Sequence, residues 1–172
     1  MSRFDETLIN FSVWNGPKEM IGIADVTPPS LSWMTGTLAG AGIAGEVEYP
    51  IMGHLSAMTL GLNFRSLTKN AVTLATPERK QIEVRGARQD EDTESGKLVV
   101  TSIKHVYVIT GKSYTPGSFA PQSNANGSGE YAVRYWAIYE NGEKVAEFDP
   151  LNGKCLIDGV DYLAPVKAAL GK

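Results

Sequence analysis

The dipeptide Asn141-Gly142 is the feature that most constrains the fold of this chain. It lies between residues 131–140 and 143–148, two runs with many apolar and aromatic side chains. Asn and Gly both tolerate the positive φ angles that a type I′ turn requires, and such a turn joins two antiparallel strands directly. The sequence therefore predicts a β-hairpin at this point.

Apolar periodicity predicts further strands. In residues 54–64 the even positions are mostly apolar and the odd positions are small or polar, which is typical of a strand with one buried face. Residues 98–110 carry apolar side chains on both faces, so we expect a long strand covered on both sides. Residues 81–87 are a shorter strand candidate.

A second hairpin is predicted near the start of the chain. Residues 8–14 and 20–26 flank Asn15-Gly16-Pro17-Lys18. Because proline has a fixed φ and no amide hydrogen, Pro17 predicts a connection longer than two residues.

Two short helices complete the expected elements. Ser66 can cap the first, which ends before Pro77. Asp161 can cap the second, at residues 162–170. The expected fold class is therefore mainly β, an antiparallel β-sandwich or a barrel-like domain with one or two short flanking helices.

The domain organisation follows from length and composition. With 172 residues, 42% apolar and 20% charged, the chain fits one domain spanning residues 1–172. Residues 35–53 are rich in Gly and Ala, and residues 113–130 are rich in Pro, Gly, Ser and Asn. We expect both to be extended loops that reach neighbouring molecules.

Charge and cysteine content exclude several classes of protein. The net charge is -3 and the isoelectric point is near 5.4, so no basic field favours tight nucleic-acid binding. Cys155 is the single cysteine, which excludes an intrachain disulfide and a cysteine zinc site. Residues 1–6 include acids where a signal peptide would be apolar, and no run reaches the roughly 20 apolar residues of a membrane span. We expect no membrane anchor.

Residues 40–45 (GAGIAG) match the dinucleotide-binding pattern G-x-G-x-x-G. That pattern binds pyrophosphate only between a strand and a helix. The residues that follow, 46–50, favour a strand and end in proline, so the context of the pattern is wrong. A loop that permits close packing is the better interpretation.

Asp90, Glu91 and Asp92 form an acidic cluster with Glu94. Counting from Asp90, the cluster lacks the glycine at the sixth position and the glutamate at the twelfth that a calcium loop needs. A solvated acidic turn between two strands is therefore expected in preference to a metal site.

Catalytic and ligand-stacking patterns are weak. His54 and His105 lie on different predicted strands, and the chain contains no G-x-S-x-G motif. Trp14, Trp33 and Trp136 lie in or beside strand runs, where large rings fill a core or an interface. We expect no enzyme activity, no cofactor and no bound metal.

Taken together, the order of these parts resembles the major tail tube proteins of contractile-tailed phages and R-type bacteriocins. The matching segments are residues 40–45 (GAGIAG), 54–65 (HLSAMTLGLNFR), 85–89 (RGARQ), 104–112, 141–149 (NGEKVAEFD) and 155–163 (CLIDGVDYL). The last two segments are the most specific of these.

The resemblance implies a structural subunit that forms stacked hexameric rings inside a contractile sheath. Its implied partners are copies of itself, the tail sheath protein, and the tape measure, baseplate and tail terminator proteins, with DNA only as transient cargo. It would be assembled in the bacterial cytoplasm and reside in the virion tail or particle tube. The interface candidates are Gly40, Ala41, Gly42, Ile43, Gly45, Tyr49, Asp90, Glu91 and Asp92.

The alternative is a monomeric β-sandwich module that binds carbohydrate through exposed aromatic rings. The sequence also leaves open which particle is involved, a phage, a headless bacteriocin or another injection particle. The residues that line the lumen and the place of residues 113–130 stay open as well.

Overall fold

The computed structural model describes residues 3–20 and 22–172, and strands dominate them. The strands are β1 (Arg3–Asn15), β2 (Lys18–Met20), β3 (Ile23–Thr27), β4 (Trp33–Leu38), β5 (Val47–Leu55), β6 (Met58–Phe64), β7 (Lys80–Asp92), β8 (Leu98–Thr115), β9 (Gly127–Glu140), β10 (Glu143–Asp149), β11 (Lys154–Ile157) and β12 (Val160–Asp161). The helices are α1 (Lys69–Leu74) and α2 (Ala164–Ala169). Among the described residues, no helix is long and apolar enough to cross a membrane. The expected mainly β, antiparallel fold class is confirmed.

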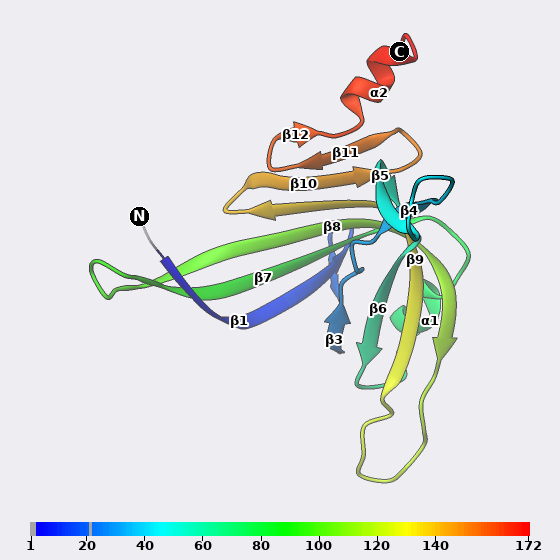
Figure 1. Ribbon diagram of the computed structural model, residues 1–172. Coiled ribbons are helices and arrows are strands. Elements are labelled where there is room, and N and C mark those ends of the chain that lie inside the picture. Colours follow the sequence, from blue (N-terminus) through cyan, green and yellow to red (C-terminus); the bar gives the residue numbers. More distant parts are fainter. Residues whose placement is uncertain (1–2, 21) are drawn as a thin grey trace.

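Ten of the strands form one antiparallel sheet, with the order β12-β11-β10-β9-β8-β7-β1-β2 along its main path (Figure 1). Strands β3 and β6 leave this path, because β6 pairs with β9 on one side and with β3 on the other. Strands β4 and β5 pair only with each other and form a separate two-stranded sheet.

Strand β9 is the branch point of the large sheet. One edge pairs with β8 along almost its whole length. On the other edge, residues 127–133 pair with β6 and residues 136–140 pair with β10. One strand therefore holds both halves of the sheet in a fixed relation, and both of its edges are paired except around residues 134–135.

The core lies on one face of this sheet. Across β8, β9 and β10, Tyr107 stacks on Trp136 with ring centroids 5.9 Å apart, and Phe148 contacts Trp136 in a tilted arrangement at 5.4 Å. Below them, β6 adds its even positions, which are all buried: Met58, Leu60, Leu62 and Phe64. Alternation along each strand sends these side chains to the same side, as the sequence period requires. We call this side the core face and the opposite side the open face.

The hairpin predicted at Asn141-Gly142 is confirmed. Both residues have positive φ, 48° and 85°, and Glu140 pairs with Glu143 across the turn. The buried even positions predicted within residues 54–64 are also present, but the strand begins at Met58. His54 belongs to β5.

The second predicted hairpin is present with a shorter connection than expected. Asn15 pairs with Lys18, so Gly16 and Pro17 alone form the turn. Gly16 takes a φ of 60° at the first central position, and the fixed negative φ of proline suits the second position of such a turn. The expected partner strand at 20–26 is divided between β2 and β3, and its residue 21 lies outside the described residues.

Both expected loops are smaller than the sequence suggested. Residues 35–53 are mostly strand, because β4 and β5 occupy all but residues 39–46. Residues 113–130 are likewise reduced to a loop at 116–126 by extensions of β8 and β9. In each case pairing of two chain segments overrides a composition that favours loops, because edge-to-edge hydrogen bonding does not depend on side chains.

Other details of the prediction also change. The first residues of β8 are not covered on both sides, since Leu98 and Val100 are 65% and 63% exposed. Helix α1 is capped by Thr68, whose hydroxyl accepts from the amide of Ala71 at 3.3 Å, and not by Ser66. Asp161 does not cap α2 and instead accepts from the amide of Leu163 at 3.0 Å, one residue before the helix begins.

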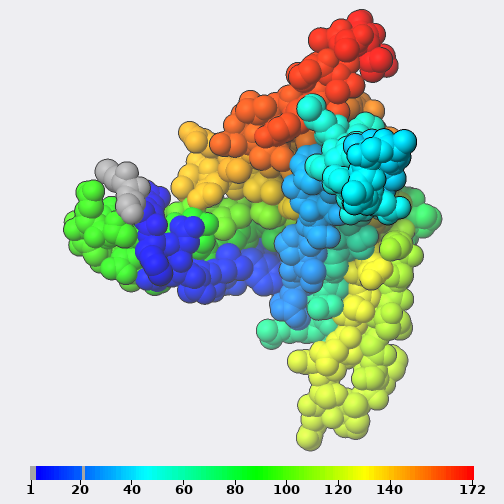
Figure 2. Space-filling model, viewed as in Figure 1, coloured from blue at the N-terminus to red at the C-terminus, as the bar shows by residue number. Residues whose placement is uncertain are grey.

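The molecule has several projections. In Figure 2 the C-terminal end, the loop between β8 and β9, and the β7–β8 turn all extend away from the body. The β7–β8 turn lies at the end of an arm made by the first residues of β1, the last residues of β7 and the first residues of β8. Such arms leave large areas of side chain and backbone in contact with solvent.

We expect Leu60→Ala to lower the free energy of unfolding by about 2–5 kcal/mol, because Leu60 is fully buried and its truncation leaves a cavity. Leu170→Ala is the matched control at a site that is 66% exposed, where the change should stay within about 0.5 kcal/mol. Urea unfolding of dilute protein measures both. Equal losses in the two variants would contradict the placement of the core.

Candidate functional site

The β4–β5 hairpin, residues 33–55, presents the glycine segment that the sequence singled out. Gly40, Ala41, Gly42, Ile43 and Gly45 are all exposed in its connecting loop, residues 39–46. The amide of Ile43 donates to the carbonyl oxygen of Gly40 at 3.1 Å, and Gly42 takes a φ of 88°. A side chain at Gly42 would be strained in this conformation, so the turn itself calls for glycine.

Both faces of this hairpin are uncovered. Along β5, Val47, Tyr49 and Ile51 point to one side and Met52 to the other, and all four are exposed. The Tyr49 ring lies over Gly36 on the facing strand, where a Cβ atom would come within 2.9 Å of the phenol. The hairpin thus offers an apolar surface that no other part of the described chain covers.

The base of the hairpin is fixed to the core face. Trp33 and Leu55 pair with each other and pack against the core cluster. At Gly53, φ is 71° and an added Cβ would lie 2.3 Å from the Leu163 side chain. The hairpin is therefore held close at its base and free at its tip.

The acidic residues 90–92 do not form the solvated turn that the sequence predicted. They are the last residues of β7, and the turn follows at residues 93–97. Asp90 is fully buried, so it lies outside any exposed surface. Asp92 closes the turn by accepting from the amides of Glu94 and Ser95, both at 3.0 Å. Glu91 is half-buried in the row that also contains Phe4 and Leu98.

Burial of Asp90 is offset by a cation. Arg88 Nε donates to its carboxylate at 2.7 Å, and the hydroxyl of Thr101 donates as well. These bonds hold the pKa of Asp90 below its usual range. Arg88 also contacts Glu140 at 3.0 Å and Asp5 at 3.2 Å, so one guanidinium joins β1, β7 and β9.

A second buried carboxylate lies on the open face. Glu147 is 6% exposed and accepts from Tyr135 Oη at 2.8 Å, Lys144 Nζ at 3.0 Å and Lys154 Nζ at 3.1 Å. Burial alone raises the pKa of Glu147, but the three donors outweigh it and lower the pKa to about 2. The cluster joins β9, β10 and β11 through side chains.

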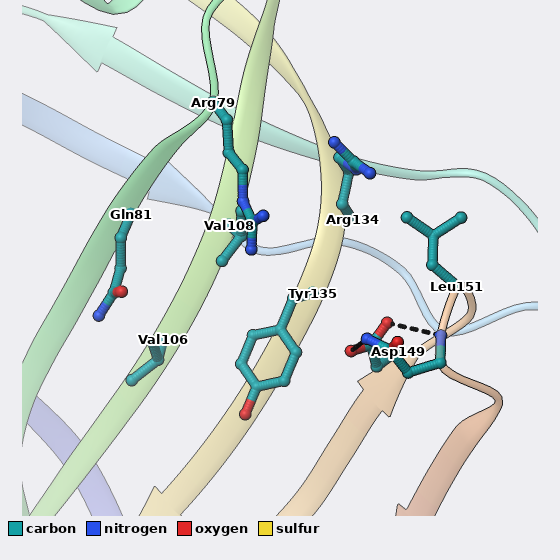
Figure 3. Close-up of a pocket in the computed structure, with 9 residues that line it drawn as sticks. Arg79, Gln81, Val106, Val108, Arg134, Tyr135, Asp149 and Leu151 are labelled. Atoms are coloured by element: carbon teal, nitrogen blue, oxygen red, sulfur yellow. Dashed lines mark hydrogen bonds between the residues drawn. The ribbon is translucent and has the colours of Figure 1, made fainter.

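Next to this cluster is a hollow that the sequence gave no reason to expect (Figure 3). Val108 and Arg134 lie on the adjacent strands β8 and β9, Arg79 directly precedes β7, and Asp149 and Leu151 form the opposite wall. A register shift between Val108 and Ile109 leaves Arg134 as an extra residue of β9. Such a bulge re-aims a side chain, and so Arg134 and its neighbour Tyr135 both line the hollow.

The residues considered for catalysis or ligand stacking lie apart. His54 is exposed on β5, whereas the half-buried His105 on β8 contacts the Tyr107 hydroxyl at 2.8 Å. Burial lowers the pKa of His105. In residues 3–20 and 22–172, no group of three His, Cys, Asp or Glu is placed to hold a metal ion.

The tryptophans do not form an exposed platform. Trp136 is buried in the core cluster, and Trp33 packs against it. Trp14 is half-buried on β1, with the Arg85 guanidinium 4.7 Å from its ring centroid. The interpretation of these rings as core or interface residues therefore holds for Trp33 and Trp136.

These features define a structural β subunit whose exposed surfaces are suited to assembly. The pattern of the family described as phage tail tube protein FII matches residues 5–171, so the chain belongs to this family. It is a structural subunit of a tail tube, as the sequence resemblance implied. A search of curated proteins found no match.

Two solved structures from PVC, an extracellular contractile injection system, are similar to the chain. The sheath/tube terminator in the extended state has a TM-score of 0.50 and 13% identity, covering 76% of this chain and 94% of that one. The sheath-tube complex in the extended state has a TM-score of 0.45 and 16% identity, covering 76% and 86%. The first of these likenesses shows a shared fold.

We expect Glu147→Gln to reduce the free energy of unfolding by about 1–2 kcal/mol at neutral pH, because the partly exposed Lys144 and Lys154 lose their carboxylate partner. The folded pKa lies below the ordinary value of 4.5, so this stabilisation is complete above pH 4.5 and is lost as pH falls toward 2. The gap between wild type and variant should close over that range in urea titrations. Glu143→Gln, at an exposed position, is the control. A gap that stays constant with pH would contradict the assignment.

Proposed function

We propose that this tail tube subunit builds the inner tube of a contractile tail or injection particle by forming hexameric rings that stack. The observation that supports this best is the excess of exposed surface. A compact monomer of 18.5 kDa has an accessible surface of about 8,200 Å², whereas this chain exposes 10922 Å². The excess falls on projecting strands and apolar side chains, which are typical sites of contact with another protein.

The interface candidates of the sequence analysis fit this role in two groups. The residues of the β4–β5 hairpin are exposed together at the tip and along β5: Gly40, Ala41, Gly42, Ile43, Gly45 and Tyr49. We propose that they contact a neighbouring copy, where small residues permit close backbone approach. In the acidic group, Glu91 and Asp92 at the end of the arm keep this proposed role, whereas the buried Asp90 supports the arm from within.

Further partners follow from the same proposal. A tube inside a contractile particle would contact a sheath along its outside, and the similar PVC protein is itself a sheath/tube terminator. Tape measure, baseplate and tail terminator proteins would meet the tube along its lumen and at its ends. DNA or another cargo passes through without a binding site, the protein has no catalytic role, and assembly takes place in the bacterial cytoplasm.

Negative-stain microscopy of the purified protein at increasing concentration tests the proposal. Rings or stacked tubes are the expected result, because the exposed apolar surface favours self-association. A monodisperse single subunit at every concentration, checked by light scattering, would overturn the proposal and favour a monomeric binding module.

We expect Gly42→Phe to block tube growth and leave the subunit folded. A Cβ atom added at Gly42 would have no other atom of this chain within 4 Å. The substitution therefore disturbs the loop and any subunit that docks there, and not the core. Gly159→Phe is the control, because it has a similar φ of 77° and equally empty surroundings in the β11–β12 turn. Circular dichroism reports folding and microscopy reports assembly. Loss of the circular dichroism signal together with assembly would contradict the expectation.

A further inference from the structure

The hollow on the open face contains two cations without partners. Arg79 and Arg134 are exposed, and neither side chain makes a hydrogen bond or an ion pair within the described part of the chain. Guanidinium groups recognise carboxylates and phosphates by paired hydrogen bonds. Two of them at one hollow of about 610 Å³ therefore point to a ligand with acidic groups.

The acids nearest to the hollow are already occupied. The two Asp149 oxygens accept from the backbone amide and the side-chain amide of Asn152, at 3.1 Å and 2.6 Å. Glu147 is held by Tyr135 and two lysines. No carboxylate of the described residues pairs with either arginine, so both are available to the acidic groups of a ligand.

The remaining lining includes the polar side chains of Gln81 and Asn152 beside three apolar ones. Val106 and Val108 form the floor, and Leu151 stands at the side with 68% of its surface exposed. A free phosphate or a nucleic-acid backbone would leave these groups in water. A polypeptide segment with carboxylates beside large apolar side chains satisfies both parts of the hollow.

The β4–β5 hairpin contains such a segment. Residues 46–52 read Glu-Val-Glu-Tyr-Pro-Ile-Met, and no lysine or arginine occurs in residues 33–55. The apolar side chain on the face of Glu46 and Glu48 is Met52, which is 58% exposed, whereas Val47 and Tyr49 point to the opposite face. Glu46 makes no ion pair within the described part of the chain, and Glu48 accepts only from the Thr35 hydroxyl at 3.2 Å.

The hairpin of the same chain is held away from its own hollow. Trp33 and Leu55 attach it to the core face. The hollow is on the open face, with Val106, Val108 and Tyr135. The sheet therefore separates the two, and the segment that enters the hollow belongs to a second copy.

We infer that residues 46–52 of one copy dock into the hollow of a neighbouring copy, with Glu46 and Glu48 meeting Arg79 and Arg134. This inference rests on the proposed tube function and names one of its contacts. A contact between two different surfaces of identical subunits is heterologous, so it repeats around a ring or along a stack and does not stop at a dimer.

Charge reversal on each side tests the contact. Glu46→Arg with Glu48→Arg, and separately Arg79→Glu with Arg134→Glu, should each raise the concentration at which tubes form by about tenfold or more, because like charges then meet. The chain with all four changes restores opposite charges and should assemble near the wild-type concentration. Light scattering and microscopy measure assembly, and circular dichroism checks that each variant is folded.

Matched controls are Arg65→Glu and Glu143→Arg, exposed residues outside both surfaces, which should assemble as wild type. Normal assembly of the Arg79→Glu, Arg134→Glu variant would overturn the inference. So would a folded fourfold variant that remains as defective as the double variants. A wild-type protein that never assembles is a different result, since it rejects the tube function itself.

Discussion

Backbone pairing along β9 is the constraint on which the rest of the structure depends. Its edge with β8 is nearly continuous, and its other edge is shared between β6 and β10. Because alternate side chains of one strand point to opposite faces, this pairing decides at once which residues enter the core and which remain on the open face. A one-residue slip of β9 would expose Trp136 and bury Tyr135 with its hydroxyl away from Glu147.

Two buried clusters of charged side chains then fix the register of the strands on either side of β9. Arg88 bonds carboxylates from three strands, and Glu147 does the same with donors from three strands. Leaving one partner of such a group unpaired costs several kcal/mol, whereas a well-paired group contributes little beyond an apolar substitute. Their effect is therefore to disfavour other strand registers in the arm and between β10 and β11. A chain with exposed strand ends needs this selectivity, because little else prevents those strands from slipping.

The large exposed surface and the family role have the same physical origin. A single subunit of this shape cannot cover its own hairpin and arm, since the strands that form them extend beyond the core. Copies of the chain can cover them, and strand edges that would be a hazard in a monomer become contacts in an assembly. The subunit is thus completed by its neighbours, which is how a tube can be both rigid and built from one small chain.

The sequence by itself determined the local features: the turn at Asn141-Gly142, the buried even positions of β6, and the family. These depend on turn geometry and on strand period, which neighbouring residues set. The hairpin at residues 33–55, the burial of Asp90 and the hollow around Arg134 were decided only by tertiary structure. Each depends on which distant strand supplies the partner, and at Arg134 on a bulge that places two successive residues on one face. Composition and period contain no information about such pairings.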